Sequence, residues 1–163
     1  MIIFLNGTLN AGKSTVAKLL EKRLPRTAVV EVDSLRNFIA WLDIDEAIPL
    51  NLKNAASVVR NFAEAGFNVI VPYPMSEADH SYLLSQLNGM DTTIHVITLR
   101  PTIEKASAST YQRTLSEWER QRIKHHHVIG LTDPGFGIII DNTSQTPEQT
   151  VAAVLKSLGL PSE

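Results

Sequence analysis

Short apolar runs alternate along the chain with longer segments whose apolar residues recur at helical spacing. The runs at residues 2–5, 28–32, 68–71, 93–99 and 138–140 each have the length and content of a buried strand. Strands that alternate with helices in this way are typical of a parallel sheet covered on both faces. The pattern therefore predicts an α/β fold of three layers, with a five-stranded parallel sheet between two layers of helices.

Apolar residues at helical spacing place the helices between these strands. We expect a helix after Gly12, two helices within residues 34–65 separated by a break at 43–49, a helix at 77–87, and a long polar helical segment from 102 to about 126. The last helix is expected to begin at Thr146, where a capping box is combined with a proline at the first helical position. No repeat or linker interrupts the pattern, so we expect a single domain over residues 1–163.

The segment between the first strand and the first helix is Gly7-Thr8-Leu9-Asn10-Ala11-Gly12-Lys13-Ser14, a phosphate-binding loop of the form G-x-x-x-x-G-K-S/T. Its glycines let consecutive backbone amides turn towards phosphate groups, and the following helix N-terminus favours an anion. Lys13 can reach the β- and γ-phosphates and act in catalysis, while the Ser14 hydroxyl can bind Mg²⁺. We therefore expect ATP and Mg²⁺ as cofactors, with the nucleotide bound by Gly7, Asn10, Ala11, Gly12, Lys13, Ser14 and Thr15.

Composition narrows the classes of function. The chain carries 15 Lys and Arg against 17 Asp and Glu, a formal net charge of −2, which gives no electrostatic case for duplex nucleic acid or an anionic membrane as partner. The absence of cysteine excludes disulfides, thiolate catalysis and cysteine-based zinc sites. Because no basic leader precedes the first strand and no apolar run approaches about 18 residues, we expect a cytoplasmic protein.

Polar residues at the carboxyl ends of the predicted strands define the candidate site, because ligands of such sheets bind at that edge. Asp33 follows the second strand, where it can accept the proton of an acceptor hydroxyl or hold Mg²⁺ through water. Arg36 lies one helical turn further on and can grip an anionic group of the acceptor, and Tyr73 follows the third strand as a further candidate for substrate binding. The alternative for Asp33 is a plain helix cap, a role that Ser34 can also fill.

A highly charged segment precedes the fifth strand, and we interpret residues 111–127 as a lid. Arginines on a lid can neutralise the transferring phosphoryl group and exclude water. At least one of Arg113, Arg120 and Arg122 is expected to contact ATP, and we assign Arg113 to nucleotide binding and Arg120 to catalysis. The alternative is a solvated helix in which Glu117 pairs with Arg120 or lies near Gln121.

Two further segments admit more than one interpretation. The tract at residues 125–127 is three consecutive histidines, which cannot converge on one metal ion while helical, so we favour a substrate-facing or lid-hinge histidine. After the fifth strand, Asn142 can frame the adenine base or belong to an ordinary turn. The larger aromatic residues fit packing in the core or lid, although Trp41 could also line an acceptor pocket: Trp41, Tyr82, Tyr111 and Trp118.

In the order of its elements the chain resembles the small P-loop kinases that include shikimate kinase, gluconate kinase and adenylylsulfate kinase, and it is most similar to the chloramphenicol phosphotransferase-like branch. The resemblance spans nearly the whole chain and rests on four segments: the phosphate loop, residues 32–35, the arginine-bearing lid, and residues 137–143. It implies a fold like that of nucleoside monophosphate kinases with a helical lid, acceptor-binding helices at about 34–65, and Asp33 as the base on the acceptor hydroxyl.

The chain departs from these relatives at the end of the third strand, where many of them place an acidic residue that helps to hold Mg²⁺. Here the strand ends Val71-Pro72-Tyr73-Pro74, without a carboxylate. The leading hypothesis is an ATP- and Mg²⁺-dependent phosphotransferase for a hydroxyl of a small molecule. A regulatory module that binds or slowly hydrolyses NTP is one alternative, favoured by the missing carboxylate, and a nucleotide kinase is another. The acceptor, the choice between ATP and GTP, and the oligomeric state stay open.

Overall fold

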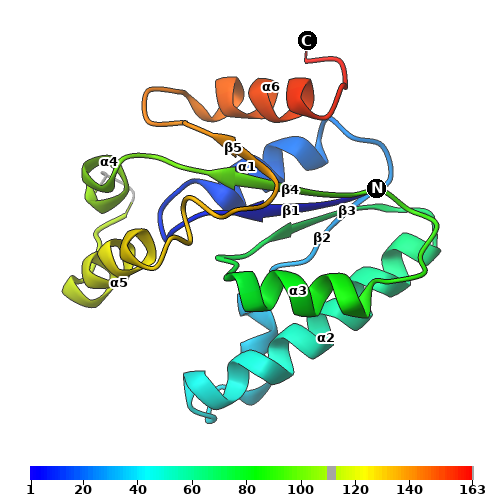
Figure 1. The fold of residues 1–163 in the computed structure, drawn as a ribbon, viewed down its shortest axis with the longest axis horizontal. Helices are drawn as coiled ribbons and strands as arrows, with labels where there is room; N and C mark the ends of the chain where they lie inside the picture. The colour runs from blue at the N-terminus through cyan, green and yellow to red at the C-terminus, as the bar shows by residue number, and fades with distance from the viewer. Residues whose placement is uncertain (110–112, 163) are drawn as a thin grey trace.

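The computed structural model describes residues 1–109 and 113–162, which fold around a five-stranded sheet (Figure 1). The strands, in spatial order β2-β3-β1-β4-β5, are β1 (Ile2–Asn6), β2 (Thr27–Val29), β3 (Asn68–Pro72), β4 (Ile94–Leu99) and β5 (Ile138–Ile140). Every neighbouring pair of strands is parallel. The predicted fold class, a five-stranded parallel α/β sheet, is confirmed.

Strand β1 lies at the centre of the sheet, between β3 and β4. All of its residues are buried, and Phe4 is in register with Val71 of β3 and Val96 of β4. A strand covered on both faces is a continuous apolar run, because neither side of its pleat meets water. The phosphate loop follows β1 directly, so it starts from the central, fully buried strand of the sheet.

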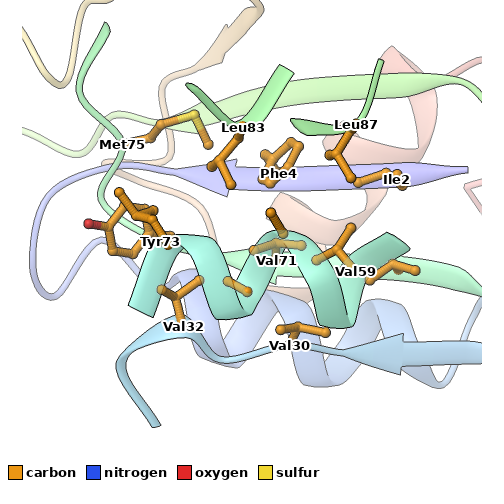
Figure 2. Close-up of a cluster of buried hydrophobic side chains, with 14 of the residues drawn as sticks. Ile2, Phe4, Val30, Val32, Val59, Val71, Tyr73, Met75, Leu83 and Leu87 are labelled. Atoms are coloured by element: carbon orange, nitrogen blue, oxygen red, sulfur yellow. The ribbon is translucent and has the colours of Figure 1, made fainter. Parts of the chain in front are cut away.

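Helices cover both faces of the sheet (Figure 1). One layer holds α1 (Lys13–Glu21) and α6 (Pro147–Ser157), and the other holds α2 (Ile44–Glu64) and α3 (Glu77–Gln86). Figure 2 shows the second layer, in which Phe4 packs beneath Leu83 of α3. The alternate residues of β1 face the opposite layer and pack with α1 and α6. The predicted three layers and the capped start of α6, with Pro147 after Thr146, are confirmed.

The segment after β2 differs from the prediction. Strand β2 ends at Val29 and not at residue 32. A 3₁₀ helix, η1 (Val32–Ile39), begins at Val32 in place of the predicted strand end. The apolar positions of this segment do not form the single buried α-helical face that their spacing predicted. Leu35 packs against the core, whereas Phe38 is 85% exposed.

The predicted break at residues 43–49 is wrong. Asp43 is the N-cap of α2, which runs for 21 residues and contains Pro49. The acidic side chains of the first turn stabilise the N-terminus of the helix through its dipole. Beyond the proline, burial of a face that includes Leu52 and Ala55 compensates for the backbone hydrogen bond that proline removes.

The predicted single polar helix from residue 102 to about 126 is also wrong. The segment holds two helices, α4 (Ile103–Ser107) and α5 (Glu117–Val128), each with its own side-chain cap. Ser116 and Glu119 form a capping box that starts α5. Part of the predicted lid, including Tyr111, lies outside the described residues. Among the helices that are described, none is both long and apolar enough to cross a membrane.

Candidate functional site

The phosphate loop joins the carboxyl end of β1 to the start of α1. Gly7 and Gly12 have φ angles of 138° and 91°, which residues with a Cβ rarely adopt. A Cβ added to Gly7 would also lie 2.5 Å from the carbonyl oxygen of Leu99, so the loop approaches β4 too closely for a side chain. Both glycines therefore sit where the backbone itself requires them.

Lys13 begins α1 and its ammonium group folds back over the loop. Its Nζ donates hydrogen bonds to the carbonyl oxygens of Gly7, at 2.9 Å, and Thr8, at 2.7 Å. Burial lowers the pKa of Lys13 to about 8, although the carboxylates of Asp33 and Glu31 act in the opposite direction. A partly desolvated ammonium group gains from an anionic partner, so this position suits a phosphate ligand.

A cavity of about 450 Å³ in front of the loop, the loop cavity, brings together several of the predicted residues. Ser14, Asp33 and Arg113 line it with Lys13. Glu31 lines the same cavity and was not recognised in the sequence. Glu31 is the N-cap of η1 and Asp33 lies in the first turn of that helix, so the closeness of Glu31 to Asp33 in the sequence was the available signal.

The donor set of the loop cavity fits Mg²⁺. Within residues 1–109 and 113–162 no three His, Asp or Glu side chains cluster as a metal site of their own. Mg²⁺ that arrives with a nucleotide needs few protein ligands, because phosphate oxygens and water fill most of its octahedron. The hydroxyl of Ser14 and the carboxylates of Asp33 and Glu31 are hard oxygen donors that line one cavity.

A second cavity, of about 240 Å³ and termed the base cavity, shares loop residues such as Ala11 and Gly12 with the loop cavity and is also lined by Asn142. The Nδ2 of Asn142 donates to the carbonyl oxygen of Ala11 at 3.0 Å, which leaves its Oδ1 as an acceptor. In the described part of the chain, this Oδ1 and the Oε1 of Gln145 are buried without a hydrogen-bond partner. Unpaired buried acceptors favour a ligand with donor groups, such as the amino group of a nucleobase. No motif marked Gln145 in the sequence.

A third cavity, of about 530 Å³ and termed the acceptor cavity, lies between η1, α2 and α5. Asp33, Arg36 and Tyr73, the predicted substrate-binding residues, all line it. Asp33 also lines the loop cavity, so its carboxylate stands at the boundary between the two spaces. The wall includes apolar side chains from α2 and α5, Ile44, Ile48 and Trp118 among them. It also includes polar side chains that the sequence did not mark, among them Asn51 and Asp79.

Two polar atoms of the acceptor cavity are unpaired. The Nε of Arg36 and the Oδ1 of Asn51 are buried, and neither has a partner among the described residues. Arg36 also donates weakly from Nη2 to the carbonyl oxygen of Leu42, at 3.5 Å. Burial, and then the charges of Asp79 and Asp33, raise the pKa of Tyr73, so its phenol stays protonated. Two residues of the cavity wall therefore keep an unused donor and an unused acceptor, which favours a polar ligand beside them.

The three candidate arginines have different surroundings. Arg113 lines the loop cavity and donates to Glu119 at 2.8 Å, and Arg122 lines the acceptor cavity. Arg120 lies 3.9 Å from Glu117 and 3.4 Å from the hydroxyl of Ser109, and it is not among the described side chains that line the loop or acceptor cavity. The ion pair of the alternative interpretation, Glu117 with Arg120, is therefore present beside the cavities.

The three histidines of α5 have separate environments. His125 and His126 line the acceptor cavity. The Nδ1 of His126 lies 3.1 Å from the hydroxyl of Thr8, whereas the Nδ1 of His127 lies 3.0 Å from the carbonyl oxygen of Ile123 in its own helix. Successive helical residues point about 100° apart, which explains this divergence.

No protein-family model matches the chain, and no curated protein sequence does. Solved structures match it nearly end to end. The tunicamycin resistance protein of Deinococcus radiodurans is 20% identical, with a TM-score of 0.72 over 98% of this chain and 96% of that one. The APS kinase of Mycobacterium tuberculosis in complex with AMPPNP and APS is 18% identical, with a TM-score of 0.71 over 97% and 96%. A gluconokinase of Sinorhizobium meliloti 1021 is 14% identical, with a TM-score of 0.71 over 96% and 90%.

These similarities establish the fold. The sheet order β2-β3-β1-β4-β5 and the two helical layers are those of a P-loop kinase fold. A fold accommodates many activities, so the function must be argued from the site.

Proposed function

We propose that the chain is an ATP- and Mg²⁺-dependent kinase that transfers the γ-phosphoryl group to a hydroxyl of a small molecule. The observation that carries the proposal is the position of Asp33, which lines both the loop cavity and the acceptor cavity. A carboxylate between a phosphate-binding loop and a second ligand cavity is where a base for an acceptor hydroxyl has to stand.

ATP is proposed to span the base and loop cavities. The loop amides and the N-terminus of α1 would bind the phosphates, with Lys13 on the β- and γ-phosphates. Asn142 and Gln145 would accept hydrogen bonds from the base. The AMPPNP bound to the APS kinase of the same fold supports this assignment.

Mg²⁺ would be held by Ser14 and, directly or through water, by Asp33 and Glu31. This arrangement would compensate for the missing carboxylate at the end of β3, because Glu31, which follows the neighbouring strand β2, supplies a second acidic group. Bound there, the ion would neutralise charge on the phosphates.

The transfer step assigns a role to each side chain around Asp33. The carboxylate takes the proton of the acceptor hydroxyl as that oxygen bonds to the γ-phosphorus, and the bond from phosphorus to the ADP oxygen breaks. Arg36 of η1 and Tyr73, which follows β3, would orient the acceptor, and Arg122 would do so from α5. Arg113, which lines the loop cavity, is better placed than Arg120 to neutralise the transferring group.

A nucleotide kinase is the second candidate. The acceptor cavity holds two arginines, Arg36 and Arg122, and guanidinium groups suit phosphate oxygens. A mononucleotide acceptor therefore belongs in the same test as other hydroxyl compounds.

The test measures ADP release from Mg·ATP by the pure protein, with and without pooled sugars, sugar acids, nucleosides, nucleotides and hydroxyl-bearing antibiotics. We expect release that depends on one pool and is lost in Asp33→Ala, while Asp91→Ala, at an exposed aspartate outside the cavities, keeps it. ADP release that no pool stimulates and that Asp33→Ala leaves unchanged would contradict the proposal and favour an NTP-hydrolysing module.

A further inference from the structure

His126 connects helix α5 to the phosphate loop. Its side chain is 3% exposed, and its Nδ1 lies 3.1 Å from the hydroxyl of Thr8, which is itself fully buried. Thr8 is the residue after the first glycine of the loop, and it is 118 residues away in the sequence. A hydrogen bond between two buried side chains fixes both, because neither can exchange its partner for water.

The two residues after Thr8 contact the same region. Leu9 packs against a small cluster formed by Ala106, Leu115 and Ile123, the last of which belongs to α5. Asn10 donates from Nδ2 to the carbonyl oxygen of Ala106, at 2.8 Å. Consecutive loop residues are therefore held by Ala106 of α4, Ile123 of α5 and Leu115.

Thr8 is held from its backbone as well. Its carbonyl oxygen accepts the 2.7 Å hydrogen bond from the Nζ of Lys13. The side chain of His126 and the ammonium group of Lys13 thus grip the same residue, and a shift of Thr8 would move the lysine's acceptor together with the loop amides that follow.

The imidazole of His126 is neutral in this environment. Burial, followed by the charges of Arg122 and Lys13, lowers its pKa to about 4. A neutral ring has one donor nitrogen and one acceptor nitrogen, and the Thr8 hydroxyl can pair with either. Its neutral state adds no positive charge next to Lys13.

We propose that His126 is a positioning residue that holds the phosphate loop through Thr8 and so sets the affinity of the loop for the nucleotide. This inference rests on the proposed function, since it takes the loop to be a nucleotide site. His126 acts through Thr8 and is assigned no contact with the phosphates.

The test measures the affinity for ADP by calorimetry, together with thermal unfolding, for Thr8→Val, His126→Leu and the double variant. Each single substitution removes one hydrogen-bonding partner, so we expect ADP to bind about threefold to tenfold more weakly in each. Because the two side chains act through one contact, the double variant should bind ADP no more weakly than the weaker single variant. His127→Leu is the matched control, since that ring contacts its own helix, and its affinity should equal that of the wild type.

Three results would overturn the inference: folded His126→Leu with the ADP affinity of the wild type, losses that multiply in the double variant, or an equal loss in His127→Leu. If His126→Leu does not fold, His126→Asn, which keeps a polar atom near the Nδ1 position, decides the question. His126→Asn should bind ADP as tightly as the wild type does, while Thr8→Val should bind it more weakly. Any other pattern of affinities would contradict the inference. If ADP binding depends on His126 and Thr8 as expected but no acceptor is phosphorylated, the proposed function alone is contradicted. If the protein is an active kinase whose ADP affinity does not depend on His126, this inference alone is contradicted.

Discussion

The side-chain amide of Asn142 donates a hydrogen bond to the carbonyl oxygen of Ala11 at 3.0 Å, and thereby ties the loop after β5 to the phosphate loop. Asn142 and Gln145 both line the base cavity, and the Oδ1 of Asn142 and the Oε1 of Gln145 are buried without a partner among the described residues. One side-chain amide thus holds the loop and keeps an unused acceptor at the wall of the cavity.

The base cavity should prefer ATP over ITP, whose base carries an oxygen in place of the amino group. An oxygen facing the acceptor atoms of Asn142 and Gln145 leaves them unpaired. Asn142→Ala should weaken ATP binding by about tenfold and reduce the preference over ITP, as measured by calorimetry. Asn54→Ala, at an exposed asparagine of α2, is the control. An unchanged preference in Asn142→Ala would refute the assignment.

Gly7→Ala should destabilise the fold and abolish nucleotide binding. The new Cβ would lie 2.5 Å from the carbonyl oxygen of Leu99 at a φ of 138°, so we expect a loss of about 1–3 kcal/mol in the free energy of unfolding. Gly135→Ala, where nothing described lies within 4 Å of the added Cβ, should change this free energy little. Urea unfolding measures both, and equal losses would show that the close approach is not what requires Gly7.

Acid should destabilise the protein partly through His126. Its folded pKa is about 4 against an ordinary 6.5, so below pH 6.5 the unfolded chain binds a proton that the folded chain does not. The free energy of unfolding should therefore fall between pH 6.5 and 4, with on the order of 3 kcal/mol due to this ring. Urea unfolding at pH 7 and pH 4 should show a loss smaller by about that amount in His126→Asn. Equal losses in the wild type and the variant would mean that the histidine is protonated in the fold.

Arg113→Ala should lower kcat more than Arg120→Ala does. Arg113 lines the loop cavity, whereas Arg120 pairs with Glu117 on the surface of α5. Removing a charge that acts on the transferring phosphoryl group costs about a hundredfold or more in kcat, and removing a surface ion pair costs little. Steady-state kinetics with the acceptor that the pooled assay identifies would measure both variants. A larger loss in Arg120→Ala would restore the role assigned to that residue from the sequence.

The elements that a strong local sequence signal determines could be predicted from the sequence. The sheet could be predicted because buried strands are continuous apolar runs. The loop at Gly7 could be predicted because its glycines have φ angles that few other residues adopt. The start of α6 could also be predicted, because Thr146 and Pro147 form a local capping signal.

The remainder depends on contacts between distant segments. The continuous helix through Pro49 is stabilised by a buried face, and the division of the segment before β5 depends on caps and on a cluster that includes Leu9. Glu31 and Asn51 carry no motif and acquire a role from the cavities that they line. Such residues become visible only when the strands and helices are placed together.

The most direct test of kinase activity follows the γ-phosphoryl group itself. The protein is incubated with Mg²⁺, ATP labelled with ³²P in its γ-phosphate, and the acceptor pools, and the products are separated. We expect label in a phosphate ester of a small molecule, formed by the wild type and by Asp91→Ala but not by Asp33→Ala. Label found in inorganic phosphate alone, at equal rates in all three proteins, would contradict the assignment of Asp33 and the kinase itself.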